Sequence, residues 1–240
     1  DLDMDGAMAE LARGSGGNDP GDRFRRAFVN VARASGRGDM RTAARDGRAA
    51  LSIAERMGWS DMQVAVHAAL GAGYLASGRV DEALASYRRG RVVSEGALGR
   101  QEPGAAKLLV QARMSEAGAL VGDERYAEAA PLYAGTAPVA EQAEDALMTM
   151  ESWRMAAFCH EQAGARDEAW RCAEAALKVG EGMKEEERGT STLPYVGAAL
   201  LRLADARGMD PAPVRARMEA LLGPDWEPAD AAAQPEEVAS

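Results

Sequence analysis

The stretch of sequence that decides the fold lies between residues 67 and 90 and reads His67-x2-Leu70-Gly71-x2-Tyr74-x3-Gly78-x4-Ala83-x3-Tyr87-x2-Gly90. Its apolar and small residues recur at helical spacing in two blocks, separated by the run Gly78-Arg79-Val80-Asp81. This layout predicts two antiparallel helices joined by a tight turn. Glycine and alanine stand where the two backbones would approach most closely, because larger side chains would not fit there.

Other stretches repeat this pattern. The clearest keeps the spacing without a gap and reads Trp153-x2-Ala156-Ala157-x2-His160-x3-Gly164-x4-Ala169-x3-Ala173-x2-Ala176. Residues 122–133 form another copy, in which Gly122 is the expected turn glycine and the turn carries two extra residues. Because one helical hairpin cannot bury its own apolar face, such copies are expected to stack on one another.

Two more copies complete the series. Residues 38–51 follow an apolar set that contains Phe24, Phe28 and Val31. Residues 195–207 have the helical period, Gly208 ends it, and Asp210-Pro211 starts another helix. Equivalent alanines are 40, 46 and 40 residues apart, and we expect them to be buried where paired helices touch: Ala43, Ala83, Ala129 and Ala169.

This organisation resembles the tetratricopeptide repeat (TPR) family, whose unit has the pattern W-x2-L-G-x2-Y, a turn glycine and A-x3-F/Y-x2-A. His67 stands at the family's Trp position and Gly90 at its last Ala. The family unit has about 34 residues, so the wider spacing here indicates longer helices or connectors. The resemblance implies an all-α fold, a right-handed α-solenoid of about five antiparallel helix pairs over residues 22–223.

The two ends lie outside the repeats. Residues 1–21 are acidic and glycine-rich, which predicts a flexible lead-in. They include Asp1-x-Asp3-x-Asp5-Gly6, similar to the start of an EF-hand loop, but Ala12 stands where that loop needs a bidentate acid, so an acidic tail is favoured over a calcium site. Residues 224–240 contain three prolines and five acids, which predicts disorder, with Trp226 packing on the last helix as a cap.

No catalytic, cofactor or metal arrangement emerges from the sequence. Cys159, His160 and Cys172 fall within one repeat, but a metal site needs three or four ligands, and neighbours on a helix point about 100° apart. The two cysteines are therefore expected to be small buried hydrophobes. With two histidines far apart in sequence, no nucleophile and base can be paired. We expect a non-enzymatic protein that needs no cofactor.

Charge and hydropathy restrict the setting and the partners. No apolar run reaches the roughly 18 residues needed to span a bilayer, and two cysteines are too few for a disulfide framework, so a cytoplasmic location is predicted. Residues 22–50 hold eight arginines against three acids, whereas the later repeats are acidic. Solvated helix faces explain this asymmetry, and the alternatives are an anionic partner at the first repeat or head-to-tail self-association.

In TPR proteins, ligands usually contact the first helix of each pair, which lines an inner groove. The resemblance therefore implies a partner-binding groove made of Phe28, Ala68, Ala72, Leu75, Glu116, Arg154, Phe158, Glu161 and Arg202. The Lys and Asn of the family's carboxylate clamp are absent, since Ala68 and Ala72 stand in their places. Phe158 between Arg154 and Arg202 suits an apolar helix or extended segment that carries one or two acids.

The favoured prediction is a protein–protein interaction module, an adaptor, assembly factor or chaperone that binds a partner peptide. One alternative is a sensor or regulatory domain of a larger bacterial signalling or transcription-regulator protein. Another is nucleic-acid binding through the arginines of the first repeat, against which the near-neutral body, the acidic tails and the lack of clustered aromatics argue. A homodimer stays open, because neither terminal helix is convincingly polar.

Overall fold

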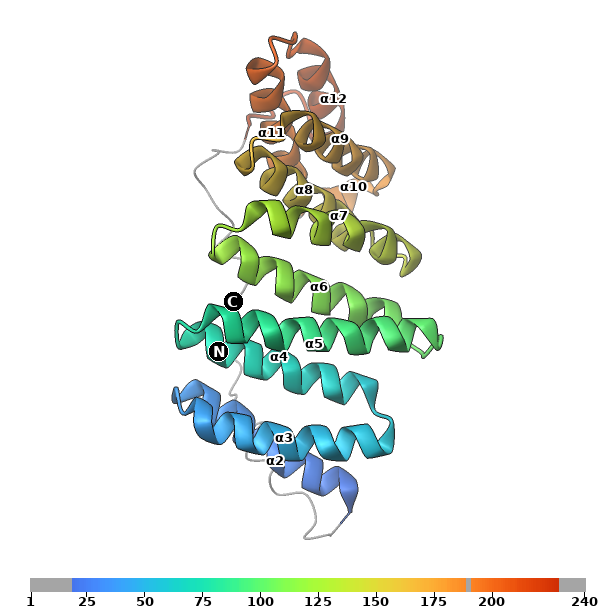
Figure 1. Cartoon of the computed structure of the whole chain (residues 1–240). Helices are drawn as coiled ribbons and strands as arrows, with labels where there is room; N and C mark the ends of the chain where they lie inside the picture. Colours follow the sequence, from blue (N-terminus) through green and yellow to red (C-terminus); the bar gives the residue numbers. More distant parts are fainter. Residues whose placement is uncertain (1–18, 189–190, 229–240) are drawn as a thin grey trace. The chain divides into compact units, whose positions relative to one another are not determined.

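The fold consists of α-helices joined by short connectors (Figure 1). The computed structural model describes residues 19–188 and 191–228, and within these ranges every regular element is helical. None of the described helices is long and apolar enough to cross a membrane. The chain divides into two compact units, Asp1–Asp123 and Glu124–Ser240.

The described part of the first unit contains three helices that come first in their pair and two that come second. In chain order they are α2 (Pro20–Gly36), α3 (Met40–Met57), α4 (Ser60–Ala76), α5 (Val80–Gly99) and α6 (Ala105–Gly122). Each helix packs against the next, and α4 also contacts α2 and α6. Contacts between every second helix are typical of stacked helical pairs, because the first helix of one pair lies against the first helix of the next.

The second unit continues the same organisation. Its described helices are α7 (Tyr126–Gln142), α8 (Ala146–Gln162), α9 (Arg166–Gly182), the single-turn α10 (Glu185–Arg188), α11 (Leu193–Ala206) and α12 (Ala212–Leu222). Here α8 packs against α7 and α9, and α11 packs against α8, α9 and α12. The side chain of Leu193 lies so close to Gly180 that a Cβ at the glycine would meet it at 2.5 Å. This contact joins α11 to α9.

Small residues of the repeats are buried, as the sequence predicts. Ala43, Ala83, Ala129 and Ala169 are each the fourth residue of a helix, and all have 0% exposed surface. A Cβ placed on Gly71 would lie 2.6 Å from the Tyr87 ring. The predicted burial of the alanines is therefore confirmed.

The long repeat arises from long helices. Most of the described helices before α10 have 17 or 18 residues, but α5 has 20, and the connector that follows it spans residues 100–104. These two features account for the wider spacing of 46 residues between Ala83 and Ala129.

The turns within pairs share one geometry. In the turn after α4, Gly78 has a φ of 68°, and the N–H groups of Gly78 and Arg79 donate to the carbonyls of Leu75 and Tyr74. This is the Schellman arrangement, which satisfies carbonyls at the end of a helix and favours glycine because φ is positive. Gly164 occupies the same position after α8, with a φ of 78°.

The turn between α6 and α7 differs from its prediction. Helix α6 continues to Gly122, so this glycine is not the turn residue, and the connector has three residues, 123–125, without an insertion. Glu124 takes the left-handed position instead, with a φ of 56°, and Glu144 does the same between α7 and α8 with a φ of 57°. The spacing prediction failed because it assumed that this position must be glycine.

The last described helix is closed by Trp226. The indole is 9% exposed and lies over Gly197 of α11, next to Met218 of α12, so the predicted cap is confirmed. The acidic segment Asp1-x-Asp3-x-Asp5-Gly6 and residues 229–240 lie outside the described residues.

Candidate protein-interaction surfaces

Three predicted groove residues lie on one face of α4, and a fourth, Phe28, lies on α2, which contacts α4. Ala68, Ala72 and Leu75 follow one another at spacings of four and three residues, which places them on one face of α4. Ala72 is exposed, whereas Ala68 and Leu75 are half-buried. On the adjacent α2, the half-buried Phe28 stacks on Phe24 with ring centroids 5.8 Å apart. These three α4 side chains are therefore apolar, and two of them are alanines.

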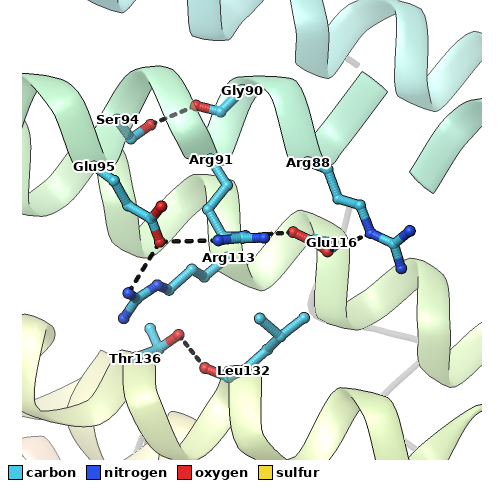
Figure 2. A network of polar contacts seen from close by, with 9 residues as sticks. All are labelled: Arg88, Gly90, Arg91, Ser94, Glu95, Arg113, Glu116, Leu132 and Thr136. Atoms are coloured by element: carbon cyan, nitrogen blue, oxygen red, sulfur yellow. Dashed lines mark hydrogen bonds and ion pairs between the residues drawn. The ribbon is translucent and has the colours of Figure 1, made fainter. Parts of the chain in front are cut away.

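Glu116 lies in the interior of the first unit and not on an open surface. It is 2% exposed, and its carboxylate accepts hydrogen bonds from two arginines of α5 (Figure 2). Arg88 Nε is 3.0 Å from Oε1, and Arg91 Nε is 2.7 Å from Oε2. A buried carboxylate is stable only when its charge is paired in this way. The side chain that the sequence assigned to the groove therefore joins α6 to α5.

A second carboxylate extends this ion-pair network. Glu95 Oε1 accepts from Arg91 Nη1 at 2.9 Å and from Arg113 Nη2 at 3.3 Å (Figure 2). The hydroxyl of Ser94, on the same helix as Glu95, is fully buried and donates to the carbonyl of Gly90 at 2.9 Å. The contact between α5 and α6 therefore includes a network of ion pairs. This network could not be predicted from the sequence, because the partners on α5 and α6 are 18 to 28 residues apart.

In the second unit, Arg154 is engaged within the chain. Its side chain is 10% exposed and forms a two-bond pair with Glu151, with N···O distances of 2.8 and 2.6 Å. Glu151 Oε2 also accepts from the hydroxyl of Thr192 at 3.0 Å. Arg154 therefore binds the carboxylate of Glu151, and this carboxylate also links α8 to the segment before α11.

The other predicted groove residues of this unit also contact one another or the core. Phe158 is half-buried and meets the ring of Tyr126 edge-on, with centroids 5.7 Å apart. Arg202 donates to Glu161 at 2.9 Å and so links α11 to α8. Both arginines expected to flank Phe158 thus have carboxylate partners, and the charge they would offer to an acidic ligand is largely neutralised.

An open cavity of about 500 Å³ in the second unit was not identified from the sequence. Three acidic residues from the end of α7 and the start of α8 line it, namely Glu141, Glu144 and Asp145, with Lys178 as the one basic lining residue. Its apolar wall includes Trp153, Val179 and Met183. Trp153 stands at the family's Trp position, and its spacing within one helix does not indicate a cavity formed with residues of α7 and α9.

The two cysteines lie in the interior of the second unit. Cys159 and Cys172 are buried and unbonded, as expected for small hydrophobes. Burial raises the pKa of Cys159 to about 12, so its sulfur stays protonated at neutral pH and is a poor nucleophile. No group of three His, Cys, Asp or Glu residues in the described part of the chain is arranged to hold a metal ion.

Comparisons with known proteins give matches in structure alone. The sequence matches no protein-family model and no curated protein. The apo form of RapI is similar over 90% of this chain at 12% identity and a TM-score of 0.65, and this chain spans 58% of the RapI chain. BtubC (BKLC) from P. vanneervenii is similar over 98% of both chains, at 17% identity and a TM-score of 0.60.

TPR-like repeats of a putative kinesin light chain from Podosopora anserina are similar over 85% of this chain and 97% of theirs, at 16% identity and a TM-score of 0.59. Identities this low carry information on the fold and not on partners. Together with the packing of successive antiparallel helices, they show that the protein has a TPR-like helical-repeat fold.

Proposed function

We propose that the protein is a non-enzymatic interaction module, an adaptor, assembly factor or chaperone, that binds an apolar segment of a partner protein. The observation that carries this proposal is the apolar face of α4 formed by Ala68, Ala72 and Leu75, on a helix that contacts α2. The alanines allow the backbone of a bound helix or strand to come close, and none of the three side chains carries a charge. TPR-like domains typically bind proteins, which supports the proposal.

The groove of the second unit is expected to contribute less charge than its sequence suggested. Because Arg154 and Arg202 pair with Glu151 and Glu161, an acidic group on the partner would compete with existing ion pairs. The half-buried Phe158 supplies apolar contact only. We therefore propose a partner segment recognised mainly by apolar contacts.

A pair of matched arginine substitutions tests this surface. Ala72→Arg adds a long charged side chain to the centre of the α4 surface, whereas Ala85→Arg adds the same side chain to an exposed position on α5. Both residues are exposed, so both variants should keep the stability of the wild type within about 0.5 kcal/mol. Proteins that co-purify with the wild type and Ala85→Arg but not with Ala72→Arg are the expected partners.

The partner so identified is then titrated against the three purified proteins by calorimetry. We expect Ala72→Arg to weaken binding at least tenfold and Ala85→Arg to leave it unchanged. Equal affinity for all three would show that the partner binds elsewhere and would rule out the α4 surface.

A further inference from the structure

One face of α2 carries unpaired positive charge along most of its length. Arg23, Arg26 and Arg33 are spaced by three and seven residues, which places them on the same side of the helix, and all three are exposed. None has a carboxylate partner among the described residues, unlike Arg25, which pairs with Asp22 at 3.1 Å. We name Arg23, Arg26 and Arg33 the basic face.

The charge of the two units is opposite in sign. In the described ranges, residues 19–123 contain 16 basic and 12 acidic side chains, a net charge of +4, whereas residues 124–188 and 191–228 contain 11 basic and 19 acidic side chains, a net charge of −8. With the remaining residues included, the net charges of the two units are +1 and −11. Two copies of the chain therefore repel as wholes but attract where the first unit of one meets the second unit of the other.

The cavity of the second unit has the chemistry to receive an arginine. Glu141 and Glu144 are exposed at its edge without a basic partner among the described residues, and Asp145 caps α8 by accepting from the N–H of Met148. A guanidinium can form two hydrogen bonds with a carboxylate while its aliphatic stem and flat face contact an aromatic wall such as that of Trp153.

We infer that this protein self-associates head to tail, with the basic face of one copy docked on the acidic cavity of the second unit of another. The basic face and the cavity are distinct from the α4 surface of the proposed function. The partner is a second copy because both complementary surfaces are present in one chain. A docked pair leaves the cavity of one copy and the basic face of the other unoccupied, so the contact propagates into longer assemblies or closes into rings.

The association should depend strongly on salt. Its contacts join exposed charges, which are individually weak and are screened within about 10 Å at 0.1 M salt and about 3 Å at 1 M. In sedimentation velocity at about 0.02 M salt, the average mass should rise with protein concentration, and at about 1 M salt the chain should be a monomer.

Charge reversal locates the contact. The double variants Arg26→Glu/Arg33→Glu and Glu141→Arg/Glu144→Arg should each fail to associate alone. An equal mixture of the two should associate, because the reversed face of one variant then meets the reversed cavity of the other, and the two native surfaces also meet. Arg89→Glu/Lys107→Glu makes the same change in net charge at exposed positions elsewhere in the first unit and should associate like the wild type. Circular dichroism verifies that each variant keeps its helices.

Several results would overturn the inference. A wild-type chain that stays monomeric at every concentration in low salt excludes it, and so does a mixture that fails to associate. If the chain is monomeric but binds an RNA duplex that Arg26→Glu/Arg33→Glu no longer binds, the basic face serves a polyanion instead. Ala72→Arg, which tests the α4 surface, should leave self-association intact, so the two proposals fail independently.

Discussion

His67 stands at the family's Trp position but introduces a titratable group into the contact between α4 and α5. The residue is 8% exposed, and its Nδ1 has no hydrogen-bond partner in the structure. A Cβ on Gly90 would lie 3.3 Å from the His67 Cβ, so the two helices leave little room for water there. Burial, and secondly the charge of Arg89, lowers the pKa of His67 from 6.5 to about 4. The neutral imidazole is therefore the form that the fold accepts.

This shift predicts a loss of stability in mild acid. Because the pKa is lower in the folded state, the unfolded chain takes up a proton first as the pH falls, and the free energy of unfolding decreases between pH 6.5 and about 4. The loss attributable to His67 is about 2 kcal/mol at pH 5. Urea denaturation at neutral and acidic pH should show that His67→Leu has a smaller pH dependence than the wild type. An identical dependence in both proteins would refute the assignment.

Ala169 tests the register of the repeats at a single residue. It has 0% exposed surface in α9, so Ala169→Glu adds volume and an unpaired charge to a closed contact. We expect a loss of at least about 3 kcal/mol, measured by urea denaturation. Ala216→Glu, at an exposed position of α12, is the matched control and should change stability by less than about 0.5 kcal/mol. A comparably small effect at Ala169 would mean that the register is wrong.

At the scale of the helix and its turn, the residue in the left-handed position of a turn affects stability. Glu144 holds this position with a φ of 57°, at a cost of about 1 kcal/mol relative to glycine. Glu144→Gly should therefore raise the free energy of unfolding by up to about 1 kcal/mol, whereas Gly164→Ala at the equivalent turn should lower it by a similar amount. Thermal denaturation of the two variants should give shifts of opposite sign, and shifts of the same sign would contradict the shared turn geometry.

Turns that contain glycine could be predicted from the sequence, whereas turns that contain glutamate could not. Gly78 and Gly164 could be placed correctly because glycine marks a positive φ. The left-handed conformation of Glu124 could not be predicted, because a glutamate side chain does not indicate a positive φ. The helix pairs and their buried alanines were predictable for the reason that a helix repeats its faces every three to four residues.

The site was less predictable than the fold, because its outcome depends on contacts between residues distant in sequence. Glu116 is buried by pairing with Arg88 and Arg91, and Glu161 binds Arg202 from 41 residues away. A repeat pattern states which helix a residue belongs to, but it does not state whether a neighbouring helix supplies a counter-charge. The apolar face of α4 could be identified because it depends on spacing within one helix alone.

At the scale of the whole molecule, a repeat fold predicts that damage stays local. Each helix of such a fold contacts only its near neighbours in sequence, so stability is a sum of local terms and not a property of one shared core. Ala169→Glu weakens the contact of α9 with α8, and α9 also contacts α11, so these helices should open first. Hydrogen exchange measured by mass spectrometry should therefore accelerate in residues 146–206 of the variant, with little change in residues 20–76. His67→Leu, as an exchange control in the first unit, should leave residues 146–206 at the wild-type rate. Uniform acceleration across the chain of Ala169→Glu would instead show that both units unfold as one cooperative body.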